Sequence, residues 1–308
     1  GKWHCGDQPE FLPLNYGFDY YYGLPYSNDM GRQRRKWKNT TMEEIDKILP
    51  PLPLIEDDEV IQEQPDQRGL IERYVERSVR FIRDNKDNPF FLYFAPLQVH
   101  LPLYAPERFV NESRNGDFGA CVESVDWAIG AILHELEKHN IYENTLIIIT
   151  SDNGSRGDNG ASNGPLRGRK GTTWEGGMRV PCIMHWKDKI ERGSKCNDIV
   201  SNIDFLPTFA KLAGVNLDSD AKIDGIDITG SMFNIDLGNG KRDVFLYYHM
   251  ENLEAIRYKN WKLHFRKKEE VFNELYNLSS DIGETQNIYN EHPEIVSQLN
   301  EIANRCRE

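Results

Sequence analysis

The order of its apolar segments is the feature that most limits how this chain can fold. Short, continuous apolar runs at residues 90–94, 145–150 and 180–186 are typical of buried strands. Amphipathic stretches at residues 66–85, 120–139 and 203–212 have the three-to-four-residue spacing of helices. Buried strands that alternate with such helices predict an α/β fold built on a doubly wound sheet.

The pattern changes after residue 240. Strand candidates at residues 244–249, 255–258, 261–265 and 274–276 are short and closely spaced, and a last helix is predicted at residues 292–305. We therefore predict an α/β domain over residues 1–240 and an antiparallel subdomain over residues 241–308. The polar stretch at residues 32–66 is predicted to be a long excursion between core elements. Its residues Arg34, Arg35 and Trp37 either shape the rim of a site or are solvated surface.

The charge balance limits the partners of the chain. Its 37 Lys and Arg residues face 49 Asp and Glu residues, so the net charge is −12. Such a chain is a poor candidate for binding nucleic acid, and any anion site must be a local cluster of cations, which a divalent metal ion would assist. The longest apolar runs are too short to span a bilayer.

Cysteine spacing and glycosylation patterns bear on the cellular compartment in which the protein resides. The five Cys residues contain no C-x-x-C pair, which disfavours zinc and leaves either a free thiol or a partner outside the chain. Asn39, Asn111 and Asn277 begin Asn-X-Ser/Thr triplets, a pattern that also arises by chance. They favour an exported protein, whether lysosomal, secreted or periplasmic.

Residues that follow the predicted strands are the first candidates for a site, because ligands of α/β sheets bind beyond the carboxyl ends of strands. Asp152 and Asn153 follow the run at residues 145–150 and offer the hard oxygen ligands that calcium prefers. A plain turn accounts for the same residues equally simply. His100, after the run at residues 90–94, could transfer a proton at a rim or be a surface histidine.

Two further segments carry cations. Lys2 and His4 lie two residues apart, so in an extended segment both could meet one anion; a solvated terminus is the alternative. Residues 168–177 are rich in glycine around Lys170, which could reach an oxyanion or lie in a flexible surface loop. This stretch fails the nucleotide-binding P-loop pattern, because Arg169 stands where that pattern has its second glycine.

In this order, the segments are together similar to the motifs of the sulfatase family. The matching stretches are GKWH at 1–4, GFD at 17–19, GLPYS at 23–27, TSDNG at 150–154, KGTTWEGG at 170–177 and ELYNLSSDIGET at 274–285. The resemblance covers essentially the whole chain. It implies a mixed, mainly parallel sheet sandwiched by helices, of the alkaline-phosphatase type, with a small antiparallel C-terminal subdomain.

The resemblance also implies roles for the cation-binding and anion-binding residues. Asp152 and Asn153 are expected to bind one calcium ion, and Lys2 and Lys170 to hold the oxygens of a sulfate ester. Placing two lysines and a metal ion around the sulfate group suits sulfate-ester hydrolysis, since fixed cations and a metal stabilise the charge that develops as the S–O bond breaks.

Three more residues take their roles from the resemblance. His4 is expected to contact the nucleophile and to act as a base in releasing sulfate. His100 is expected at the leaving-group oxygen, which it would protonate, and Ser27 matches a residue of the substrate pocket. The expected reaction is hydrolysis of an aryl or carbohydrate sulfate ester, and the expected partner is a sulfated small molecule or glycan.

One expected motif is missing. The sulfatase nucleophile is a formylglycine made in a C/S-x-P-x-R motif, and no Cys or Ser of the 308 residues begins that sequence. A first acidic pair of calcium ligands is also expected upstream of Gly1. We therefore expect this chain to lack the N-terminal part of the fold and to be inactive by itself.

Two other functions remain open from the sequence. One is a non-catalytic sulfatase-like protein that binds sulfated glycans or a partner, and the missing nucleophile motif is what favours it. The other is a phosphodiesterase or phosphonate hydrolase of the same superfamily, which would need more His and Asp metal ligands than these motifs supply.

Overall fold

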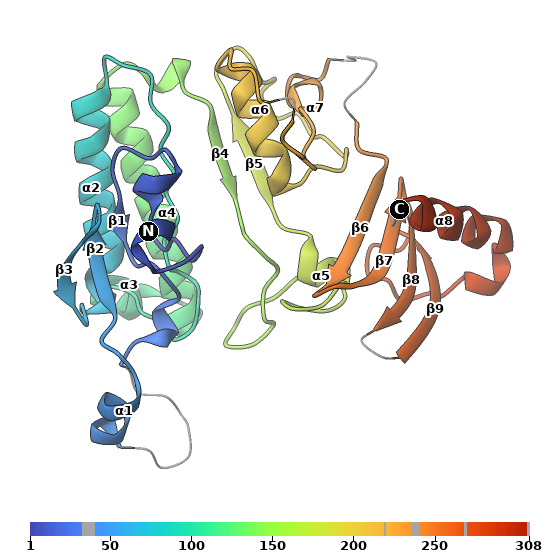
Figure 1. Cartoon of the computed structure of the whole chain (residues 1–308), viewed down its shortest axis with the longest axis horizontal. Helices are drawn as coiled ribbons and strands as arrows, with labels where there is room; N and C mark the ends of the chain where they lie inside the picture. The colour runs from blue at the N-terminus through green and yellow to red at the C-terminus, as the bar shows by residue number, and fades with distance from the viewer. Residues whose placement is uncertain (33–40, 219, 236–240, 268–269, 307–308) are drawn as a thin grey trace. The chain divides into compact units, whose positions relative to one another are not determined.

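The chain forms two compact units, Gly1–Glu143 and Asn144–Glu308 (Figure 1). The computed structural model describes residues 1–32, 41–218, 220–235, 241–267 and 270–306. The predicted domain boundary at residue 240 lies within the span of the second unit and stays a prediction. The predicted rim residues Arg34, Arg35 and Trp37 lie outside the described residues.

A small antiparallel sheet packs against helices in the first unit. Strands β1 (Tyr22–Gly23), β2 (Pro53–Glu56) and β3 (Glu59–Glu63) pair in that order. The first turns of helix α2 (Leu70–Asn85) contribute to the core beneath them. That core consists of the buried residues Tyr22, Leu24, Leu52, Leu54, Leu70, Tyr74 and Leu97.

Helix α4 (Gly116–Lys138) packs along α2 through a second apolar cluster, in which Ile71, Val75 and Ala128 are buried. The predictions of helices at residues 66–85 and 120–139 are thereby confirmed, because their apolar stripes face each other. The remaining elements of this unit are η1 (Pro9–Phe11), η2 (Pro13–Tyr16), η3 (Asn28–Met30), α1 (Met42–Ile48), η4 (Gln67–Gly69) and α3 (Glu107–Glu112), with η5 (Tyr142–Asn144) at the boundary.

The second unit begins with a two-stranded ribbon. Strands β4 (Ile147–Thr150) and β5 (Cys182–His185) confirm two of the predicted strands and pair antiparallel. Their predicted burial is wrong, since no side chain of either strand is buried and Ile183 is 60% exposed. The sequence predicts a mixed, mainly parallel sheet without saying which strands pair; these two are antiparallel across a connection, residues 151–181, that contains α5 (Glu175–Met178). Among the described residues, the parallel pairing is an isolated bridge between Lys2 and Leu24.

The predicted strand at residues 90–94 is not a strand in the structure. Side chains along this run alternate between partly buried and exposed, and Phe91 and Tyr93 are each 58% exposed. Apolar composition predicts a strand only if a neighbouring segment supplies the ladder of hydrogen bonds. Lys2 N donates to Ala95 O (2.7 Å) just beyond the end of the run.

The predicted antiparallel C-terminal sheet is confirmed. Strands β6 (Val244–His249), β7 (Asn252–Tyr258), β8 (Trp261–Lys267) and β9 (Glu270–Asn277) form a meander, and α8 (Pro293–Arg305) packs on it (Figure 1). Their shared core consists of Leu253, Ile256, Leu263, Leu275, Val296, Leu299 and Ala303. The other elements of the unit are η6 (Asn202–Asp204), α6 (Phe205–Leu212), α7 (Thr229–Phe233) and η7 (Tyr289–Glu291).

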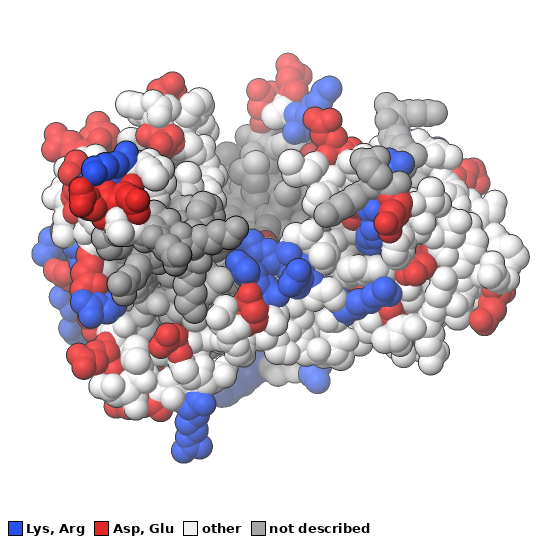
Figure 2. All heavy atoms as spheres, turned by 90° about the horizontal axis from the view of Figure 1, so that it is seen from below, with Lys and Arg blue, Asp and Glu red and all other residues white. Residues whose placement is uncertain are grey.

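The described residues also show how charges, helices and cysteines are distributed in the molecule. Figure 2 shows acidic and basic side chains interspersed on the visible face, with basic side chains gathered in small groups. None of the described helices combines the length and the apolar composition needed to cross a membrane. All five Cys residues are unpaired thiols in the structure, which is consistent with their odd number.

Candidate functional site

The N-terminal segment lies against the chain after β1. Trp3 N donates to Leu24 O and His4 N to Pro25 O, both at 2.9 Å. These bonds hold the backbone of Lys2 and His4, the two predicted cations of this segment. His4 has a φ of 61°, which ends the extended conformation, so the two-residue alternation does not by itself place its ring beside Lys2.

Ser27 and His100 lie together although 73 residues separate them in sequence. Ser27 is buried, and its Oγ lies 3.5 Å from His100 Nδ1. The same Nδ1 lies 2.7 Å from Leu101 O. A carbonyl oxygen can only accept, so this contact favours the tautomer with hydrogen on Nδ1 and the basic lone pair on Nε2. In this tautomer the neutral ring accepts a proton at Nε2, and only the ring protonated there can donate one.

The first unit therefore gathers four of the predicted site residues. His4 is bonded to Pro25, two residues before Ser27, and Ser27 contacts His100. Lys2 is held in the same arrangement through its bridge to Leu24. The sequence motifs at residues 1–4, 23–27 and around His100 are thus one structural neighbourhood within this unit.

The second unit gathers the remaining three, Asp152, Asn153 and Lys170. Gly154 N donates to Gly177 O (3.1 Å), and Lys170 N donates to Ser155 O (2.9 Å). A Cβ on Gly154 would lie 1.9 Å from Gly176 O, so only glycine permits this approach of the two backbones. The DNG turn and the lysine-containing segment therefore form one interlocked pair of loops.

Asp152 and Asn153 fit a calcium ion in the type of donor but not in number. In the part of the chain that the structure describes, neither side chain forms a hydrogen bond or an ion pair, so their oxygens remain available. Calcium takes six to eight oxygen ligands, and these residues offer a carboxylate and an amide. Within the described residues, no group of three or more His, Cys, Asp or Glu side chains is arranged to hold a metal.

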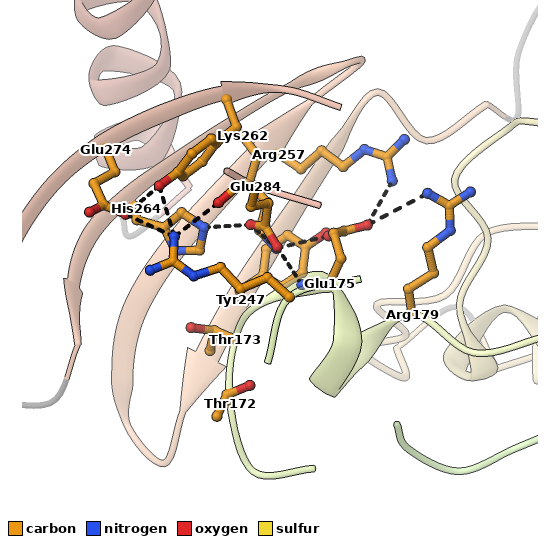
Figure 3. Close-up of polar contacts among 12 residues, drawn as sticks. Thr172, Thr173, Glu175, Arg179, Tyr247, Arg257, Lys262, His264, Glu274 and Glu284 are labelled. Carbon is orange, nitrogen blue, oxygen red and sulfur yellow. Dashed lines mark hydrogen bonds and ion pairs between the residues drawn. The ribbon is translucent and has the colours of Figure 1, made fainter. Parts of the chain in front are cut away.

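A buried charge cluster around Glu175, five residues after Lys170 in the sequence, was missed by the sequence analysis (Figure 3). Lys262 Nζ lies 2.8 Å from Glu175 Oε1 and 3.1 Å from Glu284 Oε1, and all three side chains are excluded from solvent. Tyr247 OH donates to Glu175 Oε1 (2.9 Å). Burial, reinforced by the Glu175 carboxylate, raises the pKa of Tyr247 well above its usual value, so this hydroxyl stays a donor.

His264 closes the cluster on its other side. Its Nε2 lies 2.7 Å from Glu284 Oε1, and its Nδ1 is buried without a hydrogen-bond partner. Burial, followed by the charges of Lys262, Lys267 and Arg167, holds the pKa of His264 well below its usual value. A neutral ring that donates from Nε2 to Glu284 satisfies this geometry, since an Nδ1 proton would find no acceptor.

Two signals in the sequence could have revealed this cluster. Glu175 and Glu284 both lie inside stretches that match sulfatase motifs, at residues 170–177 and 274–285. Lys262 and His264 alternate with Leu263 in β8, and alternation puts them on the face opposite the apolar core. Only the tertiary structure shows that this polar face is covered.

Comparisons with known proteins bear on the family. Residues 1–215 match the model of the sulfatase family, and residues 169–308 match the model of the C-terminal part of N-sulphoglucosamine sulphohydrolase. N-acetylgalactosamine-6-sulfatase of Canis lupus familiaris is 34% identical over 275 residues, covering 86% of this chain and 51% of that protein. Arylsulfatase A of Bos taurus is 32% identical over 336 residues, covering 97% and 65%. The chain spans about half to two thirds of these relatives.

Solved structures show the same fold. The PsFucS1 sulfatase from Pseudoalteromonas sp. superposes with a TM-score of 0.86 at 28% identity, covering 99% of this chain and 68% of that one. Ps i-CgsB in complex with k-i-k-neocarrahexaose gives a TM-score of 0.80 at 28% identity, covering 99% and 70%. These matches confirm the predicted fold class, and with the family model matching residues 1–215, the chain belongs to the sulfatase family.

Proposed function

We propose that this chain supplies the sulfate-binding and leaving-group side of a sulfatase that hydrolyses sulfuric esters of carbohydrates. The observation that carries the proposal is the interlocked pair of loops in the second unit. Two backbone hydrogen bonds there bring a carboxylate, an amide and a lysine from two separate motifs into one neighbourhood. Oxygen donors beside an ammonium suit a metal ion that shares an anionic ligand with a lysine.

Lys170 and Lys2 are proposed to bind the sulfate oxygens. The Lys170 side chain is exposed, and within the described residues it forms no hydrogen bond or ion pair, so its ammonium is available to an anion. A sulfate ester carries one negative charge, and a second develops on the ester oxygen as the S–O bond breaks. Fixed ammonium groups stabilise both charges.

His100 is proposed to protonate the departing alcohol, with Ser27 beside it in the substrate pocket. With Nδ1–H bonded to Leu101 O, the proton given to the alcohol would be the Nε2 proton of the imidazolium form. His4 is proposed to contact the nucleophile and to accept a proton when sulfate is released.

Asp152 and Asn153 are proposed to hold one calcium ion together with ligands from outside these two residues. When bound, the ion would neutralise part of the charge on the sulfate group. Because calcium requires more ligands than this pair offers, we expect weak calcium binding by the chain alone.

The proposed nucleophile is a formylglycine, which is not encoded in these 308 residues, since no Cys or Ser begins a C/S-x-P-x-R sequence. We therefore propose that this chain by itself does not hydrolyse sulfate esters, even with calcium. Steady turnover of an aryl sulfate by the pure chain, lost on Lys170→Ala, would contradict this part of the proposal.

The proposed substrate class is a sulfated carbohydrate, and the proposed compartment is exported. N-acetylgalactosamine-6-sulfatase names a sulfated sugar as the substrate of a relative, and one structural neighbour was solved with k-i-k-neocarrahexaose. Of the three glycosylation triplets, Asn111 is exposed and Asn277 partly buried, whereas Asn39 lies outside the described residues. Exposure of Asn111 is compatible with glycosylation.

A titration with inorganic sulfate and with N-acetylgalactosamine 6-sulfate, followed by NMR of the ¹⁵N-labelled chain, tests the proposal. We expect shifts at the amides of residues 152–154 and 169–172, and their loss in Lys170→Ala. A matched control is Lys187→Ala, an exposed lysine of the same unit. If the two variants behave alike, the sulfate site is not at Lys170.

A sulfatase-like protein that binds sulfated glycans without hydrolysis is the second candidate, favoured by the missing nucleophile motif. It predicts tight glycan binding by the chain as it stands. The first candidate predicts binding that strengthens when a longer chain contributes further calcium ligands. The titration distinguishes these outcomes by the dissociation constant of the sulfated sugar.

A further inference from the structure

The segment at residues 167–177, hereafter the lysine loop, is attached at its beginning to the C-terminal sheet. Arg167 Nη1 donates to Tyr276 OH on β9 and to Glu284 O, each at 3.0 Å. The same guanidinium lies 3.6 Å from the ring centroid of Trp174, near the other end of the loop. One side chain thus connects both ends of the loop to the sheet.

The end of the lysine loop is attached more extensively. Thr173 Oγ1 donates to Glu254 Oε2 on β7 (2.7 Å) and accepts from Lys267 Nζ on β8. The ring of Trp174 lies 4.1 Å from the ring of His264. Residues from two strands therefore fix the two positions that precede Glu175.

Glu175 is bonded to the sheet through both its backbone and its side chain (Figure 3). Its N–H donates to Glu284 Oε2 (2.7 Å), and its Oε1 accepts from Lys262 Nζ (2.8 Å) and Tyr247 OH (2.9 Å). Its Oε2 lies 3.8 Å from Arg257 Nη1. Buried carboxylates are retained as anions only when they are paired in this way.

Within the loop, backbone contacts relay this attachment to Lys170. Gly176 N donates to Arg167 O (2.7 Å), which closes the loop, and a Cβ on Gly177 would lie 2.1 Å from Thr172 O. Thr172 Oγ1 donates to Arg169 O (2.7 Å). These contacts connect the middle of the loop to Glu175, so we expect a displaced Glu175 to displace the backbone of Lys170.

We propose that Lys262 and Tyr247 are positioning residues for sulfate binding, which hold Lys170 in place through Glu175 without touching the substrate. The proposal rests on the proposed role of Lys170 in binding sulfate. Lys262 is fully buried, and its ammonium faces two carboxylates and the ring of Tyr247 (4.1 Å to the centroid). Through its contact with Glu175, Lys262 supports the end of the lysine loop.

Two variants of different severity test this inference in the full chain. Lys262→Met removes the buried ammonium, and Tyr247→Phe removes one hydrogen bond to Glu175 and keeps the ring. The matched control is Tyr248→Phe, the same change at the neighbouring, 45% exposed position of β6. Amide hydrogen exchange at Lys170, Glu175 and Gly176 reports the loop, because the structure gives each of these amides an acceptor.

We expect loop-amide exchange to accelerate about tenfold or more in Lys262→Met and about threefold in Tyr247→Phe, as expected for weakened local structure. Sulfate affinity should fall about fivefold and twofold, respectively, because a mobile lysine is not preorganised. Tyr248→Phe should change neither quantity. Exchange of β4 and β5 amides should match the wild type in Tyr247→Phe, which a general loss of stability would not allow.

Unchanged loop exchange in folded Lys262→Met or Tyr247→Phe would overturn the inference, and so would faster exchange with unaltered sulfate affinity. If Lys262→Met does not fold, Tyr247→Phe against Tyr248→Phe decides by the same two measurements. Failure of the proposed function has a different signature. In that case Lys170→Ala binds sulfate as tightly as the wild-type chain does, whatever Lys262→Met and Tyr247→Phe show.

Discussion

Lys262 and Glu175 form an ion pair with 2.8 Å between Nζ and Oε1, and their side chains are 0% and 1% exposed. The pair joins a strand of the C-terminal sheet to the loop that carries Lys170. Because Glu284 contacts the same ammonium at 3.1 Å, two buried carboxylates share one lysine. This relationship makes stability and the proposed site interdependent.

Removing the lysine should destabilise the fold strongly. Lys262→Met leaves two buried carboxylates without their shared partner, and we expect a loss of about 3–5 kcal/mol in the free energy of unfolding, measured with urea. Lys47→Met is the control, since Lys47 and Glu43 are 69% and 81% exposed and such pairs contribute about 1 kcal/mol or less. Similar losses in both variants would contradict the role of burial.

Stability should fall as the solution is acidified below the usual histidine pKa. Burial and neighbouring cations hold the pKa of His264 below 6.5 in the folded chain, so between that lowered pKa and 6.5 the unfolded chain binds a proton that the folded chain does not. This contribution to stability is complete above pH 6.5. It is lost as pH falls below 6.5, by up to about 1.4 kcal/mol per pH unit.

Urea unfolding at pH 7.5, 6.5 and 5.5 measures this dependence. His264→Gln removes the titrating ring, and we expect a smaller decrease in unfolding free energy between pH 6.5 and 5.5. His292→Gln, at a partly exposed position, should keep the dependence of the wild type. An equal slope in all three proteins would show that another group is responsible.

A methyl group between the interlocked loops should disrupt them. In Gly154→Ala the new Cβ would meet Gly176 O at 1.9 Å, so the backbones must separate. We expect a loss of about 1–3 kcal/mol in unfolding free energy and weaker sulfate binding. Gly130→Ala, in α4 with nothing within 4 Å of the new Cβ, should be neutral or stabilise by about 1 kcal/mol. Sulfate binding by Gly154→Ala at wild-type strength would disprove the loop arrangement.

The role proposed for His100 predicts a dependence on the leaving group. In a hydrolytically active sulfatase that contains this chain, His100→Ala should slow esters of poor leaving groups about 10²–10⁴-fold, the usual contribution of a general acid. Esters of nitrophenols, which leave without protonation, should be affected much less. Rates of a series of aryl and alkyl sulfates measure this, and equal losses across the series would exclude the acid role.

Periodicity and local motifs were sufficient for several features of this protein. The apolar stripes of α2 and α4 and the short strands of the C-terminal meander follow from the spacing of side chains along one segment. The motifs around Lys170 and Asp152 named the candidate site, because the residue types that bind anions and metals are local in sequence. The family followed from the order of those motifs.

The tertiary structure alone decided which segments lie together. The run at residues 90–94 has the composition of a strand but no ladder, and the antiparallel pairing of β4 with β5 is not encoded in the sequence of either strand. Lys262 in the sequence looks like any lysine of a half-exposed strand. Its burial against Glu175, 87 residues away, depends on a loop closing over the polar face of the sheet, a long-range contact that no local pattern encodes.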